Sequence, residues 1–197
     1  MTSGPSRKAA ALVALLGLGL GAAAARAAPP GTPFTRLMGL LAARQRGEVT
    51  FVARTDAAGL TRPLESSGVL RYRAPDHLEQ QTLEPAPSDL ILDGERLTVR
   101  RGGHTRHVDL RDYPDIAVYV DALRDTLAGR GAALERRFTV RWRGTLDHWQ
   151  LTLVPLRAGA RVRRIRLAGA AADIRTIEIL AAHGARTVMR IGPPPAA

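Results

Sequence analysis

The chain has 197 residues, which is room for one domain or two small ones. Hydrophobic residues make up 45% of it and charged residues 24%, an ordinary globular composition that excludes a disordered chain. Cysteine is absent, which excludes a disulfide scaffold, a cysteine-ligated metal site, a thiol nucleophile and a lipoprotein anchored through an N-terminal cysteine. The net charge is +11, but only 4% of the residues are aromatic, too few for extensive base stacking. We therefore expect no nucleic-acid partner, and only a salt-dependent attraction to anionic surfaces.

The first 27 residues have the order of a secretory signal peptide. Two basic residues precede an uncharged apolar run over residues 9–25, and Ala25-Arg26-Ala27 fits an A-x-A cleavage site. This order predicts cleavage near Ala27 and a periplasmic protein. An uncleaved membrane anchor is the alternative interpretation, although a spanning helix normally needs about 20 apolar residues, usually with bulkier side chains.

Two segments have the apolar spacing of amphipathic helices. The first carries Phe34, Leu37, Met38 and Leu41 and ends near Gly47. In the second, Pro114 suits a first helical position and Gly129 suits the C-terminal end. Its apolar stripe consists of Ile116, Val120, Leu123 and Leu127. Asp121 and Asp125 lie between these positions and predict a solvated helix face.

Most of the remaining chain alternates between apolar and polar residues, which is the period of half-buried β-strands. Short turn signals separate the runs, and Asp93-Gly94 between two apolar runs predicts a hairpin. The pattern predicts about ten short, mostly antiparallel strands. The alternating runs are residues 48–54, 64–72, 78–83, 90–92, 97–99, 107–110, 138–142, 149–153, 163–167, 174–180 and 186–191.

The fold class that follows is mainly β with two helical regions. Each strand has one apolar face and one polar face that often carries arginine, as Phe138, Val140 and Trp142 alternate with Arg141 and its neighbours. This pattern suits one strongly curved sheet whose apolar inner face the two helices cover. No change of composition marks a second domain, so we expect a single domain over residues 28–192 and a loose, proline-rich tail over 193–197.

Five segments carry a resemblance to a known family. They are Phe51-Val52-Ala53-Arg54, the strand from Ser67 to Pro75, the corner marked by Leu78, Thr82 and Pro85, the hairpin from Leu90 to Leu97, and the strand from Trp149 to Pro155. In this order, and with the signal peptide, they resemble the LolA-like periplasmic lipoprotein carriers of Gram-negative bacteria. The short loops and the Ser66-Ser67-Gly68 strand look closer to a divergent subgroup associated with lipid or polyene biosynthesis and export.

The resemblance implies an incomplete antiparallel β-barrel with helices as a lid. It also implies a monomeric carrier without enzymatic activity or cofactor, which takes acyl chains of lipoproteins, or another lipid, toward the outer membrane. An inner-membrane exporter and an outer-membrane acceptor would be its partners, with transient proximity to the membrane. Such a carrier would contribute to outer-membrane biogenesis.

An acyl carrier needs a concave apolar surface that its own side chains do not fill, and a cover for that surface in water. The residues predicted to line this cavity are Val49, Phe51, Leu70, Tyr72, Leu90, Leu92, Trp142, Trp149, Leu151 and Leu153. Those predicted to form the underside of the lid are Leu37, Met38, Leu41, Ile116, Val120, Leu123 and Leu127. Core packing is the alternative interpretation for each of these residues.

One position departs from the family pattern. The carriers have an arginine immediately before the proline that follows their second strand, and this arginine helps to hold the lid closed. Here Ala74 stands before Pro75, and the nearest arginine, Arg73, lies on the opposite face of an extended chain. Control of the lid by that arginine therefore does not carry over.

The segment Arg161-Val162-Arg163-Arg164-Ile165-Arg166 is the densest charge feature. Alternation places Arg164 and Arg166 on one face of a strand. Arg161, Arg163, Arg164 and Arg166 are predicted to contact anionic lipid headgroups or an acidic partner. A solvated strand edge is the alternative.

Two further functions remain open from the residues. The same fold could be an accessory or docking subunit of a lipid export or biosynthesis complex, with an open strand edge as its docking surface. More distantly, Ser66 or Ser67 could serve a lipid-modifying hydrolase, although the G-x-S-x-G setting is missing. His104 and His107 lack a nearby third ligand, so we predict no metal site. We also predict no catalytic residue.

Overall fold

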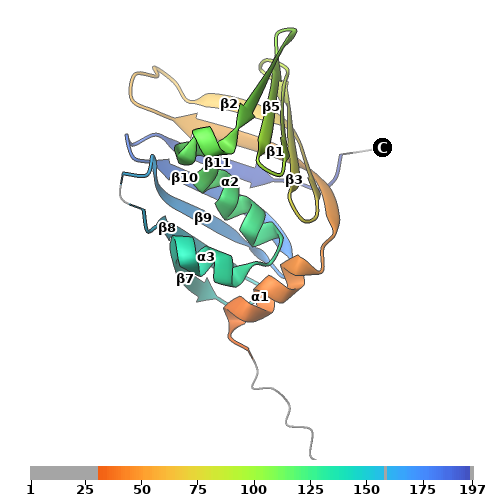
Figure 1. Ribbon diagram of the computed structural model, residues 1–197, viewed down its shortest axis with the longest axis vertical. Coiled ribbons are helices and arrows are strands. Elements are labelled where there is room, and N and C mark those ends of the chain that lie inside the picture. Colours follow the sequence, from red (N-terminus) through yellow and green to blue (C-terminus); the bar gives the residue numbers. More distant parts are fainter. Residues whose placement is uncertain (1–30, 158, 196–197) are drawn as a thin grey trace, which may run out of the picture. The chain divides into compact units, whose positions relative to one another are not determined.

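The computed structural model describes residues 31–157 and 159–195 (Figure 1). The predicted signal peptide, with its cleavage site at Ala27, lies outside the described residues. None of the helices in the described part of the chain is long and apolar enough to cross a membrane.

Eleven antiparallel strands form one curved sheet in the order β6-β5-β4-β3-β2-β1-β11-β10-β9-β8-β7. All neighbours are consecutive in sequence except β1 and β11, which pair from Phe51↔Ile191 to Asp56↔Arg186. Within the described residues β6 and β7 are the two edges, so the barrel is incomplete, as predicted. The strands are β1 (Arg46–Asp56), β2 (Leu64–Arg73), β3 (His77–Glu84), β4 (Ser88–Asp93), β5 (Arg96–Arg101), β6 (His104–Asp109), β7 (Phe138–Gly144), β8 (Trp149–Pro155), β9 (Val162–Ala170), β10 (Asp173–Ala181) and β11 (Arg186–Ile191).

The helices lie on one side of this sheet, with α2 crossing in front of its strands (Figure 1). Their bounds are α1 (Pro33–Ala42), a 3-10 turn η1 (Leu110–Asp112), α2 (Pro114–Leu127) and α3 (Gly131–Arg137). The Thr32 hydroxyl caps α1 by accepting from the Thr35 amide. Both α1 and α2 begin with proline, and for Pro114 of α2 this confirms the sequence-based prediction. Helix α3 is not among the predicted elements.

The apolar positions of the strands face the helices, and one half of this concave side is a packed core. Side chains of β8 and β9 meet those of α1 and α3 there, with α2 above β9. Gly129, at φ +65°, ends α2 where a Cβ atom would lie 2.2 Å from the Met38 carbonyl oxygen. Only glycine allows α2 and α1 to approach so closely.

The C-terminal segment runs beside the start of β1. The Pro193 carbonyl accepts hydrogen bonds of 3.0 Å from both the Thr50 amide and the Thr50 hydroxyl. The predicted loose tail therefore begins with a residue that is held to the sheet.

Candidate functional site: an apolar cavity under helix α2

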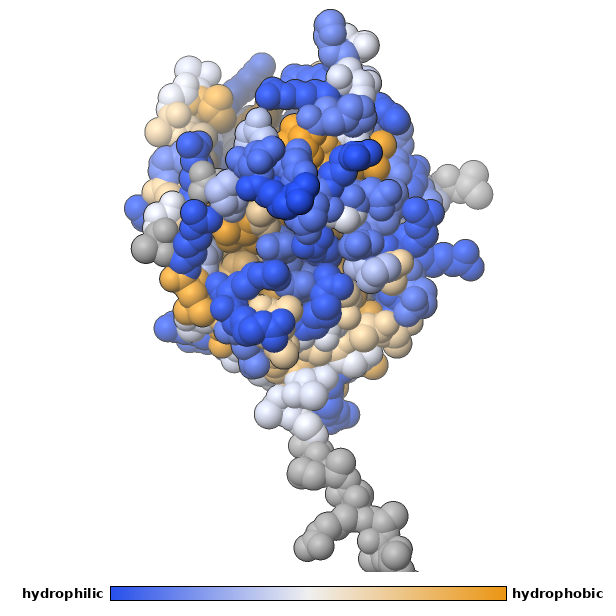
Figure 2. All heavy atoms as spheres, in the orientation of Figure 1, coloured by the Kyte–Doolittle hydropathy of each residue, from blue (hydrophilic) through white to orange (hydrophobic). Residues whose placement is uncertain are grey.

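A cavity of about 240 Å³ lies between α2 and the concave face of the sheet. Its walls come from β1 to β5, from β10 and β11, and from α2, so it occupies the half of the concave side that α1 and α3 leave unfilled. The apolar lining residues are Val49, Leu70, Tyr72, Leu78, Leu90, Leu92, Leu97, Ile116, Tyr119, Val120, Leu123, Leu127, Ala172, Ile174, Ile177, Met189 and Ile191. On the face shown in Figure 2, hydrophilic side chains predominate and hydrophobic ones are visible only in small patches between them.

Nine of the sequence-predicted residues lie against this cavity. Five come from the sheet and four from the inner stripe of α2. They are Val49, Leu70, Tyr72, Leu90 and Leu92, and Ile116, Val120, Leu123 and Leu127. The strand registers explain the first set, because Val49 lies opposite Leu70 and Leu92 lies opposite Leu78 on the same face of the sheet.

The other predicted residues lie outside the cavity. Phe51, Trp149, Leu151 and Leu153 are buried in the packed core, and Trp142 stacks on Trp149 with ring centroids 6.2 Å apart. The α1 residues Leu37, Met38 and Leu41 are also core residues. The expectation that all these side chains face one cavity is thus corrected: α1 and α3 fill the concave side over β7 to β9, and only α2 covers a hollow.

Sequence reasoning missed the contribution of the C-terminal strands to the cavity wall. Ile177 and Met189 lie opposite one another on β10 and β11, and Ile174 and Ile191 lie on the same side. The alternation within each strand was visible in the sequence. What was not visible is the pairing of β11 with β1, which places Ile191 opposite Phe51 and Met189 opposite Ala53.

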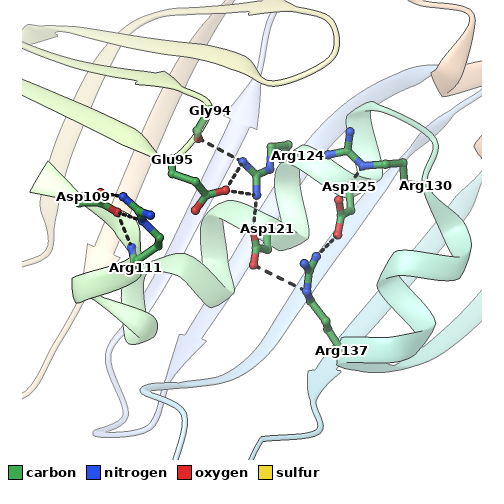
Figure 3. Close-up of polar contacts among 9 residues, drawn as sticks. All are labelled: Gly94, Glu95, Asp109, Arg111, Asp121, Arg124, Asp125, Arg130 and Arg137. Carbon is green, nitrogen blue, oxygen red and sulfur yellow. Dashed lines mark hydrogen bonds and ion pairs between the residues drawn. The ribbon is translucent and has the colours of Figure 1, made fainter.

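Arg124 fastens α2 to the β4–β5 turn (Figure 3). Its side chain is 11% exposed, and it donates to the Gly94 carbonyl and to Glu95 Oε1 at 3.1 Å each. It also donates to Asp121 Oδ1 at 2.6 Å on its own helix. Burial alone would lower the pKa of Arg124, but Glu95 and Asp121 outweigh burial and raise it. These contacts hold α2 over the cavity.

Asp125 fastens α2 to α3 in the same way (Figure 3). Its carboxylate is 3% exposed and accepts from Arg130 Nε at 2.8 Å and from Arg137 Nη1 at 2.6 Å. The prediction of a solvated face for Asp121 and Asp125 is therefore wrong. Arg124 of the same helix pairs with Asp121, whereas Arg130 and Arg137, which cover Asp125, lie beyond the end of α2.

Two tyrosines, Tyr72 and Tyr119, line the cavity. Burial raises the pKa of Tyr119, on α2, to about 12. Burial also raises the pKa of Tyr72, with a smaller opposing effect of the Arg130 charge and a smaller supporting effect of Asp76. Both phenols therefore stay protonated at neutral pH, and they are hydrogen-bond donors rather than bases.

The arginine-rich segment lies on β9, and its convex-face residues surround Glu178 of β10. Arg166 Nη1 lies 3.1 Å and Arg164 Nη2 3.6 Å from the Glu178 carboxylate. Arg186 of β11 adds a third contact at 3.2 Å. Arg163 is exposed beside the register shift between β9 and β10. Three guanidinium groups around one carboxylate leave an excess of positive charge on this face.

The residues considered for chemistry do not assemble into a site. Ser66 and Ser67 lie opposite Ala53 and Val52 on β1, and so on opposite faces of the sheet. His107 Nδ1 lies 3.1 Å from the Thr98 hydroxyl on the neighbouring strand. Within residues 31–157 and 159–195, no group of three or more His, Asp or Glu side chains could hold a metal ion.

Comparison with known proteins identifies the family to which this chain belongs. The model of the family described as outer membrane lipoprotein carrier protein LolA-like matches residues 22–192. The chain belongs to this family. No curated protein matches it.

Three solved structures show distant likeness to this LolA-like chain. A LolA superfamily protein from Nitrosomonas europaea is 11% identical, with a TM-score of 0.46 over 82% of this chain and 93% of that one. The MucA/MucB complex of Pseudomonas aeruginosa contributes a chain that is 15% identical, with a TM-score of 0.44 over 83% of this chain and 58% of that one. LprF from Mycobacterium bovis is 12% identical, with a TM-score of 0.36 over 85% of this chain and 96% of that one.

The LolA-like cavity of this chain has its own arrangement of arginines. Arg73, next to Ala74, is exposed at the end of β2. Arg44, after α1, lines the cavity instead, and its Nη2 atom lies 2.6 Å from Asp173 Oδ1 at the start of β10. This ion pair and the Arg124 contacts link the helical segments to the sheet in this structure.

Proposed function

We propose that this protein is a periplasmic carrier that binds the acyl chain of a lipoprotein or a lipid in the cavity under α2. The observation that supports the proposal is the cavity itself: its walls are mainly apolar, and a helix that is attached by a few polar contacts covers it. A buried polar cluster or a metal site would favour a chemical reaction, but the described lining offers mainly hydrocarbon.

The energy for such binding comes from removing methylene groups from water, which contributes about 0.8 kcal/mol for each CH₂. The cavity volume of about 240 Å³ is slightly below the range of about 300–1,000 Å³ that is usual for small-molecule pockets. A long acyl chain would therefore require α2 to move outward or the chain end to remain at the opening. In the ligand-free protein, α2 shields the apolar lining from water. This cover prevents aggregation through an exposed apolar surface.

The location and partners in this proposal rest on the sequence. The signal-peptide pattern of residues 1–27 supports export to the periplasm, and the family supports transfer of lipid toward the outer membrane. An inner-membrane exporter would load the monomeric carrier and an outer-membrane acceptor would unload it. The excess of arginine on the convex face around Glu178 would favour brief contact with anionic headgroups.

Substitution of adjacent residues on the two faces of β4 tests the binding site. Leu90 lines the cavity, whereas Ile91 lies on the opposite face of the same strand and is also partly buried. Titration with a fluorescent fatty-acyl probe should show about tenfold weaker binding for Leu90→Gln, because an amide would replace several apolar contacts. Ile91→Gln should bind within about twofold of wild type.

Equal losses in the two variants would contradict the assignment, because they would show a general effect on the sheet. Thermal unfolding of both proteins, measured alongside, identifies such an effect. Absence of probe binding by the wild-type protein would contradict the carrier function as a whole.

The open edge of the sheet favours a second candidate function. Strand β6 has no neighbour on its outer side among the described strands, and His104 to His107 are exposed along it. An extended segment of another protein could add there as a further strand, which would suit an accessory subunit. This function predicts a partner complex that survives Leu90→Gln but is lost when Thr105→Pro removes an edge amide.

A further inference from the structure

Tyr72 places a polar group on the wall of the apolar cavity. It lies on β2 opposite Gly47 of β1 and Leu78 of β3, which puts its side chain on the concave face. The residue is 8% exposed and lines the cavity.

The Tyr72 hydroxyl is buried and has no hydrogen-bond partner among the described residues. The buried Trp149 indole, by contrast, donates to the Ala171 carbonyl at 2.9 Å. An unpaired buried hydroxyl lowers the stability of the empty protein, since the group has left water and gained no partner. A phenylalanine would fill the same space without that loss, so the hydroxyl points to an acceptor supplied from outside the chain.

A second polar side chain lies close by on the same wall. Gln80 of β3 lines the cavity and is two residues along from Leu78, so it is a diagonal neighbour of Tyr72 across the strand pair. Its Nε2 group has one weak contact, 3.4 Å to the Thr82 hydroxyl. The lining near Tyr72 thus offers hydrogen-bond donors at one place in a hydrocarbon surface.

We propose that the Tyr72 hydroxyl donates a hydrogen bond to the carbonyl oxygen of the acyl group that occupies the cavity. This inference rests on the proposed carrier function and adds the part of the cargo that is recognised. The hydrocarbon chain lies against the aliphatic wall, and the carbonyl oxygen, from an ester or a free acid, marks where the chain stops. The cavity then selects acyl compounds over plain hydrocarbon chains of the same length.

Paired ligands test this selection. A fatty-acid methyl ester and the alkyl methyl ether of equal length compete with a fluorescent acyl probe on the full mature protein. Wild type should bind the ester about 3- to 10-fold more tightly than the ether, as expected for one neutral hydrogen bond. Tyr72→Phe should lose this preference while its affinity for the ether stays within about twofold. Tyr113→Phe, which changes an exposed phenol at the start of α2, is the matched control.

Each result decides the inference. A preference for the ester that survives in Tyr72→Phe overturns it and leaves the carrier function standing, whereas wild-type protein that binds neither ligand overturns both. The melting temperature of Tyr72→Phe should be unchanged or higher, and a marked decrease would show an internal partner for the hydroxyl and overturn the proposal. The free fatty acid, as a third ligand, identifies the source of the carbonyl. If Tyr72→Phe binds only the ester more weakly than wild type does, the cargo is an ester. If it binds the ester and the free acid more weakly to the same extent, Tyr72 recognises the carbonyl of either kind.

Discussion

Glu178 is the residue at which three arginines of the convex face converge. Its side chain is 11% exposed, and the contacts come from β9 on one side and β11 on the other. The hydrogen bond from Arg186 is the main cause that lowers the pKa of Glu178, and the charges of Arg166, Arg186 and Arg164 add to it against the effect of burial. The carboxylate therefore stabilises the junction of three strands as long as it is ionised.

This gives a prediction for the pH dependence of stability. A carboxyl group whose pKa is lower in the folded state contributes stability above its ordinary pKa of 4.5, and the contribution is lost as pH falls through the lowered value. Glu178→Gln should lower the free energy of unfolding by about 1–3 kcal/mol at pH 7 and by less at pH 3. Urea unfolding at both pH values measures this difference. The control is Glu65→Gln, which changes a carboxylate that is 69% exposed; an equal pH effect there would contradict the account.

The same cluster shows which features of single residues the sequence predicts and which it does not. Period-two alternation correctly placed Arg164 and Arg166 on one face of β9. Their partner Glu178 is 12 residues beyond Arg166 on another strand, and only the register of β9 with β10 brings the three together. The headgroup contact predicted for Arg161, Arg163, Arg164 and Arg166 stays a prediction.

Helix α2 is the element on which access to the cavity depends. It presents Val120 and Leu123 to the cavity and is attached at its polar side by Arg124 and Asp125. Arg124 donates to the Gly94 carbonyl in the turn between β4 and β5, and so links α2 to the strands that form one wall of the cavity.

Removal of this link should loosen the helix. Arg124→Met keeps much of the side-chain volume but loses the hydrogen bonds to Gly94 and Glu95. We expect faster amide hydrogen exchange in α2 and a loss of about 1–3 kcal/mol of stability. Arg111→Met, which removes an arginine that is 76% exposed and pairs with Asp109, should leave exchange in α2 unchanged. Exchange in α2 that is equally slow in both variants would show that the Arg124 contacts do not hold the helix.

Among the elements, α1, α2 and the strands could be predicted because each repeats an apolar position at a regular spacing. Helix α3 could not, because Leu134 is the only fully buried side chain in its seven residues and one position has no period. Its effect on the site is nevertheless large, since α3 and α1 fill the concave side over β7 to β9.

At the scale of the whole molecule, one concave face serves two purposes. Over β7 to β9 it is a solid core built around Trp149, Leu151 and Ile165, and over β1 to β5, β10 and β11 it is a cavity under α2. The sequence predicts which residues lie on the apolar face. It does not predict which of them line the cavity and which pack in the core, because Leu70 and Leu151 have equal hydropathy and equal strand spacing. The division depends on where three helices fit on one sheet, which no local pattern encodes.

The most direct test of the carrier account is native mass spectrometry of the mature protein purified from a periplasm. The account predicts a bound species with the mass of an acylated peptide or a lipid, and that mass distinguishes a lipoprotein cargo from a free lipid. It also predicts that Leu90→Gln carries less of this species than Ile91→Gln. A ligand-free mass for the wild type, together with no uptake of a fluorescent fatty-acyl probe, would contradict the account and favour the docking function of the open sheet edge.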